Sequence, residues 1–113
     1  MGAAAKALGV ALGAFGAHGL RSRLSPDLLA IYETGVRYHL VHGLALFVAA
    51  WTAGRDPRAA RLAGVLFALG ILLFSGSLYL LALTGVRGWG AVTPLGGLAW
   101  IAAWVLIAWR ARR

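Results

Sequence analysis

The sequence of 113 residues contains no cysteine. This absence excludes disulfide bonds, thiol catalysis and zinc sites with cysteine ligands. Acidic residues are also scarce, because three Asp and Glu accompany eleven Lys and Arg and three His. A nucleophile with an adjacent base, a pair of catalytic carboxylates or a phosphate-binding loop cannot be assembled from these few groups in their positions. Enzymatic catalysis is therefore the least favoured class of function.

Charge of either sign is also rare. Charged residues make up 12% of the chain and hydrophobic residues 61%, whereas soluble domains are about 45–50% apolar. A small soluble domain has too much surface to bury this apolar area in one core. The formal net charge of +8 resembles that of a nucleic-acid-binding protein, but the basic residues stand at the ends of apolar runs instead of along one polar face. We therefore expect a membrane protein with no nucleic-acid partner.

The three prolines mark helix starts, because each follows a residue that favours the N-cap position. These pairs are Ser25-Pro26, Asp56-Pro57 and Thr93-Pro94. The glycines that are expected to end helices in the left-handed conformation are Gly19, Gly54 and Gly85. The pattern predicts an all-α fold with helices over about 4–19, 26–53, 57–84 and 94–110 and no strand. These helices are expected to form a single domain that covers residues 1–113.

The apolar runs indicate an integral membrane four-helix bundle. Residues 62–83 carry no charge, and as a helix they match a hydrocarbon core of roughly 30 Å. The helix over 26–53 is composite, since its first three turns carry charged residues and are expected in or near the head-group region. The first and last helices are short, and long side chains are expected to reach from them to the interface. These side chains are Lys6, Trp109 and Arg110.

The distribution of basic residues predicts the orientation, because Lys and Arg accumulate at cytoplasmic loops. The side with both termini holds Lys6, Arg55, Arg58, Arg61, Arg110, Arg112 and Arg113. The other side holds Arg21, Arg23, Arg37 and Arg87. The first set is larger, so both termini are expected in the cytoplasm. There Arg110, Arg112 and Arg113 would anchor anionic lipid head groups, and Trp51, Trp104 and Trp109 would form the inner aromatic belt.

A ridge of small residues runs along the first helix. Its members recur at four-residue spacing and are Ala5, Gly9, Gly13 and Ala17. Such a ridge lets another helix backbone approach closely. The favoured partner is a helix of the same chain, for which Ala60, Gly64 and Ala68 offer a possible mate; a homo-oligomer through this ridge is the alternative. We expect the helix to be retained and not cleaved as a signal segment, because Phe15 is too bulky for a cleavage site after Ala17.

The second helix carries the most polar segment of the chain, from Tyr32 to His42. Glu33 and Arg37 are four residues apart and are expected to form an ion pair on one side of the helix. Tyrosine and histidine side chains lie on the opposite half. The simplest explanation of two polar faces is that one side of the helix contacts water and the other contacts protein. With polar groups of other helices, they define a candidate ligand site on the outward half. Its residues are His18, Glu33, Arg37, Tyr38, His39, His42, Ser75 and Tyr79.

Two chemistries remain open for these histidines. At a spacing of three residues, His39 and His42 can converge on one ion, but a third ligand is not obvious. Two histidines on one helix face also cannot supply both axial ligands of a haem; only His18 paired with one of them could. We therefore expect no metal or other cofactor, and a hydrogen-bonding network is favoured. Arginines at the same end would make a pocket mouth positive and favour anionic ligands, including lipid head groups.

Four segments resemble the small membrane proteins grouped as domain of unknown function four-two-three. These segments are Gly13 to Leu20, Tyr32 to His39, Leu73 to Tyr79 and Thr93 to Gly97, in this order, and the resemblance covers nearly the whole chain. It implies a bacterial inner-membrane protein of four helices and implies no activity. All four segments fall on the half where the polar residues are expected.

Two functions therefore stay open from the sequence. The first is the binding or transport of a lipid, a quinone or another small molecule in a pocket on the outward half. The second is a structural or assembly role in the membrane without a ligand pocket. A small proton-coupled efflux pump is disfavoured, because similar pumps carry a membrane-embedded carboxylate in the first span and this first helix has none.

Overall fold

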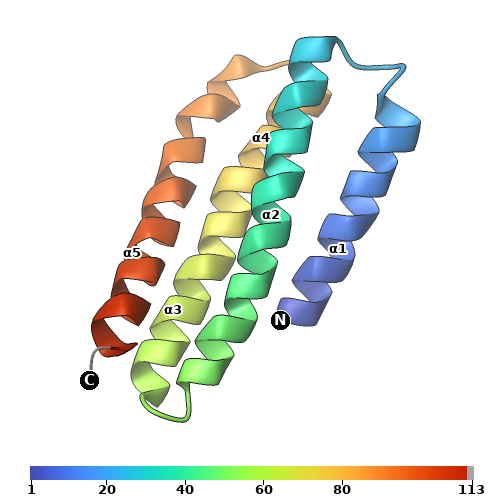
Figure 1. Cartoon of the computed structure of the whole chain (residues 1–113). Helices are drawn as coiled ribbons and strands as arrows, with labels where there is room; N and C mark the ends of the chain where they lie inside the picture. The colour runs from blue at the N-terminus through green and yellow to red at the C-terminus, as the bar shows by residue number, and fades with distance from the viewer. Residues whose placement is uncertain (112–113) are drawn as a thin grey trace.

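The computed structural model describes residues 1–111. They form four helical rods that lie side by side, with successive rods running in opposite directions (Figure 1). Both ends of the described chain point toward the end of the bundle that carries the α2–α3 loop, which we call the α2–α3 end (Figure 1). The predicted all-α fold of four helices is confirmed, and no strand occurs in the described range.

The rods are less regular than the sequence pattern predicts. The first consists of α1 (Gly2–Phe15) and a π-helical turn η1 (Gly16–Leu20), and the second is α2 (Pro26–Thr52). The third consists of α3 (Pro57–Gly70), a π-helical turn η2 (Ile71–Ser75) and α4 (Gly76–Thr84). A short 3₁₀ turn η3 (Arg87–Ala91) leads into α5 (Thr93–Ala111). Apolar periodicity did not reveal the two π turns, because a single widened turn barely disturbs the hydrophobic pattern of a long helix.

The predicted helix starts and ends hold to within two residues, but two of the three glycines expected to be left-handed are not. The Ser25 hydroxyl accepts a hydrogen bond from the Leu28 amide at 3.2 Å, and the Asp56 carboxylate accepts one from the Ala59 amide at 3.0 Å. Within residues 1–111, only Gly85 adopts the left-handed conformation, with φ of 72°.

The other two glycines have different surroundings. Gly19 lies inside the right-handed turn η1. Gly54 is not needed as a left-handed cap, because the amides of Arg55 and Asp56 both bond the Thr52 carbonyl at 3.0 Å. Carbonyls at a helix end can therefore be satisfied by a right-handed turn, which the sequence alone did not distinguish.

Three of the rods are long and apolar enough to cross a membrane, namely Gly2–Leu20, Pro57–Thr84 and Arg87–Arg110. The remaining rod, α2, lies beside α3 and α4 along its length (Figure 1). Its first turns pack against the third rod. Gly35 contacts the ring of Tyr79, and the Ser75 hydroxyl donates to the Gly35 carbonyl at 2.7 Å. Both partners belong to the uncharged run 62–83, so this part of α2 lies beside that run.

The ridge of small residues on α1 contacts α2. A Cβ atom added at Gly9 would lie 2.8 Å from Leu40, and one at Gly13 would lie 3.1 Å from Val36. The mate of α1 is thus α2, and the expected pairing with α3 is wrong because α2 lies between the two helices (Figure 1). Ala17, at the end of the ridge, is exposed.

Two side chains form hydrogen bonds across the contact between α1 and α2. The Lys6 amine donates to the Leu40 carbonyl at 3.2 Å, and the Tyr32 hydroxyl donates to the Leu12 carbonyl at 2.6 Å. Lys6 therefore points into the contact between the helices instead of reaching the membrane interface, as the sequence had led us to expect. The second lone pair of a helix carbonyl beside this close contact offers the amine a partner.

The contact between α3 and α5 is closer still. A Cβ atom at Gly96 would collide with the backbone nitrogen of Phe74 and lie 2.9 Å from the Gly70 carbonyl. One turn further along α5, the Trp100 indole donates to the Phe67 carbonyl at 3.2 Å. The buried core continues from here between α2, α3 and α5 through alanines, which are Ala45, Ala49, Ala63 and Ala103.

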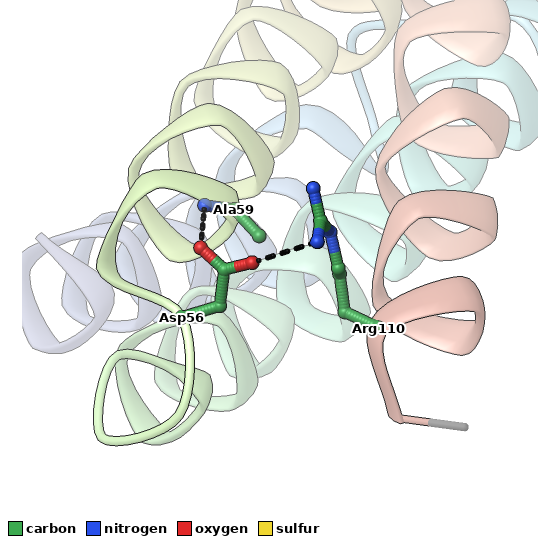
Figure 2. A network of polar contacts seen from close by, with 3 residues as sticks. All are labelled: Asp56, Ala59 and Arg110. Atoms are coloured by element: carbon green, nitrogen blue, oxygen red, sulfur yellow. Dashed lines mark hydrogen bonds and ion pairs between the residues drawn. The ribbon is translucent and has the colours of Figure 1, made fainter. Parts of the chain in front are cut away.

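A salt bridge closes the α2–α3 end (Figure 2). Arg110 lies 3.2 Å from the Asp56 carboxylate, whose other oxygen caps α3. The hydrogen bond from the Ala59 amide, followed by the nearby Arg110 guanidinium, lowers the pKa of Asp56 below its ordinary value. Arg110 is thus engaged within the protein. The other two expected lipid anchors, Arg112 and Arg113, lie outside the described residues.

Candidate functional site

His42 connects α2 to α5 through both of its ring nitrogens. Nδ1 lies 2.9 Å from the Tyr38 carbonyl, which only accepts hydrogen bonds, so this nitrogen carries the proton. Nε2 then accepts a hydrogen bond from the Trp104 indole at 3.2 Å. The ring also stacks on Trp100 with 3.7 Å between centroids and 2° between planes. These contacts fix one neutral tautomer and leave no ring nitrogen for a ligand.

His39 lies one turn earlier and faces a different neighbour. It is 2% exposed, and its Nδ1 shares a hydrogen bond of 2.8 Å with the Tyr79 hydroxyl of α4. Its other nitrogen, Nε2, is buried and has no hydrogen-bond partner. The edge of the ring faces α1, where a Cβ atom at Gly9 would lie 3.4 Å from it. His39 therefore joins α2 to α4 and leaves one polar atom unsatisfied.

Aromatic rings and hydroxyls surround the two histidines. Tyr38 stacks on Trp100 with 5.9 Å between ring centroids and lies 5.0 Å from Phe74. Tyr32 and Tyr79 are in ring contact at 5.2 Å. Five of the predicted site residues therefore gather beside the uncharged run in a cluster that we call the histidine cluster. These are Tyr38, His39, His42, Ser75 and Tyr79.

The other three predicted site residues do not join this cluster. His18 is exposed in the turn η1 at the end of the first rod. Glu33 and Arg37 are exposed on α2. The expected ion pair between them is absent, since the one salt bridge among residues 1–111 joins Arg110 to Asp56.

The sequence reading missed both indoles that bind His42. Trp104 was assigned to the inner aromatic belt, and Trp100 was not considered. Their positions four residues apart on α5, beginning one turn after Gly96, provide the missing signal. A close glycine contact brings α5 against the third rod, and the large residues one and two turns later on α5 reach His42 of α2.

A cavity lies away from the histidine cluster, near the α2–α3 end of the bundle. It has a volume of about 480 Å³ and is lined by the start of α1 and by facing residues of α2 and α3. We call it the inner groove. Arg61 is the one charged side chain in its lining, and the residues that bear on its chemistry are Leu46, Phe47, Ala60, Arg61, Gly64 and Val65. A Cβ atom at Gly64 would meet no atom within 4 Å, so the space in front of it is open.

The structure does not bring a metal site together from these groups. No three His, Asp or Glu side chains converge within residues 1–111. The inner groove contains none of the predicted site residues, which lie nearer the middle and the opposite end of the bundle. The signal that could have revealed the groove is the pair of small residues Ala60 and Gly64, one turn apart beside Arg61. It had been assigned instead to contact with the first helix.

The chain has close relatives among bacterial membrane proteins. It is 47% identical over 109 residues to "UPF0382 membrane protein YwdK" of Bacillus subtilis, with 95% of this chain and 89% of the relative covered. A UPF0382 membrane protein of Staphylococcus haemolyticus is 44% identical over 107 residues, covering 95% and 88%. One of Haemophilus influenzae is 42% identical over 100 residues, covering 88% and 81%.

No solved structure matches the chain. The family described as "Protein of unknown function (DUF423)" matches residues 12–97. This range contains all of the histidine cluster and Arg61 with Gly64 of the inner groove. Both the family match and the relatives agree with the resemblance seen in four segments of the sequence, and with three rods able to cross a membrane. The chain is a membrane protein that belongs to the DUF423 family.

Proposed function

We propose that this protein resides in the bacterial inner membrane and binds an anionic phospholipid from the cytoplasmic leaflet in the inner groove. An acyl chain occupies the groove, and the phosphate of the head group contacts Arg61. The observation that carries the proposal is an apolar cavity of about 480 Å³ with a single lining arginine, at the more basic end of the bundle.

The shape and lining of the groove support an apolar ligand. Its volume lies within the range of about 300–1,000 Å³ that is common for small-molecule sites. Ala60 and Gly64 keep the α3 wall low, while Phe47 and Val65 supply apolar surface. A polar ligand would find few partners on the α2 and α3 walls, because the carbonyls and amides of these two helices bond within their own helices.

The distribution of charge supports an anionic head group. Arg61 lines the groove, and Arg55 and Arg58 are exposed at the same end of the bundle. Each basic residue near a membrane surface attracts anionic lipid by about 1 kcal/mol. The orientation expected from the basic residues would direct this end toward the cytoplasm, where anionic lipid is met.

A purely structural role is the second candidate, and the histidine cluster favours it. Both ring nitrogens of His42 form hydrogen bonds within the protein. A cluster built only to join helices has this property, whereas a ligand site usually presents free donors or acceptors. The two candidates differ in whether the groove holds a specific lipid, so they can be separated by experiment.

The test compares retention of phosphatidylglycerol and phosphatidylcholine by native mass spectrometry of detergent-purified protein. Replacing Gly64 by Leu fills open space and is expected to abolish phosphatidylglycerol adducts without lowering the melting temperature. Arg61→Gln is expected to lower phosphatidylglycerol occupancy roughly fivefold, which corresponds to about 1 kcal/mol. Arg58→Gln is the matched control, since Arg58 is exposed on the same helix but does not line the groove.

Equal retention of the two lipids by the wild type would contradict the proposal. So would undiminished phosphatidylglycerol adducts in Gly64→Leu. Either result would favour the structural role, provided that the variants remain folded.

A further inference from the structure

One side of α2 remains uncovered by the other helices. At 100° per residue, Glu33, Arg37, Val41, Leu44 and Trp51 fall within one arc of about 80°. All five are exposed, with Val41 50%, Leu44 54% and Trp51 73% accessible. The opposite half of α2 is buried, from Tyr32 through His39 and His42 to Ala49. We call the exposed arc the α2 face.

The two charges of the α2 face lie alongside the uncharged run of the third rod. Gly35, between them in sequence, contacts Tyr79 and accepts the hydrogen bond of Ser75. Both residues belong to the uncharged run of residues 62–83, so Glu33 and Arg37 lie opposite apolar turns. Ionised groups are costly in lipid, and they usually face a protein partner or a water-filled cavity. A single copy in lipid would leave both of them facing hydrocarbon.

Neither charge finds a partner inside the described chain. The salt bridge of residues 1–111 is the distant one between Asp56 and Arg110, and no hydrogen bond of the Glu33 or Arg37 side chain is formed. The helices packed against α2 place no oppositely charged side chain within salt-bridge distance of either group in the described chain. The missing partner must therefore come from outside the chain.

The pattern of the α2 face is complementary to itself. It carries one negative and one positive charge one turn apart, followed by apolar residues toward the α2–α3 end. Two parallel copies related by a two-fold axis along the membrane normal would bring each Glu33 near the other copy's Arg37. Leu44 and Trp51 of both copies would meet below these pairs. An anionic lipid, in contrast, would satisfy Arg37 and leave Glu33 repelled.

We propose that the α2 face is a self-association surface, on which two copies of this chain form reciprocal ion pairs between Glu33 and Arg37. The surface is separate from the inner groove, and the proposal does not depend on lipid binding there. It also differs from a contact through the ridge of α1, because that ridge is already covered by α2.

The experiment measures pairing in liposomes by energy transfer between labelled copies. Because the sequence has no cysteine, Gly54→Cys supplies a single labelling site in an exposed loop. We expect Glu33→Arg alone and Arg37→Glu alone to weaken self-association roughly a hundredfold, because like charges then face each other across the two-fold axis. Asp27→Arg, which reverses another exposed charge of α2, is expected to associate like the wild type.

Mixing the two single variants separates pairing between copies from pairing within one helix. Glu33→Arg has two positive charges on the face and Arg37→Glu has two negative ones, so the mixture is expected to form mixed pairs while each variant alone does not. Glu33→Gln and Arg37→Gln provide milder versions that depend less on insertion and folding of a reversed charge.

A wild type that stays monomeric at every ratio of protein to lipid would overturn the proposal. Single reversals that associate as tightly as the wild type, or a mixture that forms no mixed pairs, would also overturn it. A monomeric wild type whose retained phosphatidylglycerol is lost in Arg37→Glu would assign the face to a lipid instead.

Discussion

The two sides of α2 are packed by different means. On the α5 side, large rings interlock, because His42 stacks on Trp100 and accepts a hydrogen bond from Trp104. One turn before Trp100, Gly96 of α5 meets the third rod in a contact too close for any side chain. On the α1 side, small residues form a shallow seam with two long side chains across it. This difference shows that α5 is held by the shape of interlocking rings, whereas α1 is held by α2 side chains seated against its glycines together with two hydrogen bonds.

The difference also appears in polar satisfaction. On the α5 side, both nitrogens of His42 have partners, whereas Nε2 of His39 faces α1 without one. A buried polar atom without a partner costs about 1–3 kcal/mol. The α1 side therefore starts from a weaker position, and we expect α1 to separate from the bundle before α5 does.

The sharpest way to break the comparison is Gly96→Val. The added side chain would collide with the backbone of Phe74 and α3, which cannot move aside as a flexible side chain can. We expect a loss of about 4 kcal/mol or more, seen as a failure to purify monodisperse protein. Gly97→Ala is the control, because its Cβ would lie at an ordinary distance of 3.9 Å from Phe74. A normal melting temperature for Gly96→Val would show that α5 is not held by shape.

His42→Ala is expected to have the second largest effect. It removes a buried ring from between Trp100 and Phe67 and leaves the Trp104 indole without an acceptor. By analogy with truncation of other large buried side chains, we expect about 3 kcal/mol of destabilisation in equilibrium unfolding in mixed micelles. His18→Ala, which removes an exposed imidazole, should leave stability unchanged. Wild-type stability of His42→Ala would argue against a bridging role and for a ligand site.

Tyr32→Phe should have the smallest effect of the three and should act on the other side of α2. It removes only the hydrogen bond to the Leu12 carbonyl, and such bonds contribute about 0.6–1.7 kcal/mol in membrane proteins. Hydrogen exchange is expected to rise in α1 and to stay constant in α5. Tyr38→Phe, whose hydroxyl makes no hydrogen bond within the described chain, provides the comparison. Faster exchange in α5 as well would mean that the two sides unfold together.

The sequence was sufficient for those features that depend on local chemistry. Proline after an N-cap residue marked the starts of α2 and α3, and Gly85 marked the end of α4. Small residues at four-residue spacing correctly indicated a packing seam on α1. The identity of its mate was missed, because a ridge specifies a close approach and not the helix that makes it.

Site prediction succeeded only where residues share one helix. Tyr38, His39 and His42 were found together because they lie within two turns of α2. Trp100 and Trp104 were missed, since their proximity to His42 depends on how close α5 comes to α2, which Gly96 controls from a full turn away. The inner groove depends on where α1 begins relative to α2 and α3, and no local pattern encodes that offset.

The π turn at Ile71–Ser75 sets the angular relation between the two parts of the third rod. A turn closed by i→i+5 bonds holds one residue more than an α-helical turn, and one residue corresponds to a rotation of about 100°. Phe67 and Gly70 thereby point toward α5 before the turn, while Tyr79 meets His39 and Tyr32 after it. Loss of one residue from this turn would keep the rod apolar and nearly as long, but would swing one half out of phase with its neighbours. The π turn thus lets the two halves of the third rod present their contact residues in two different directions.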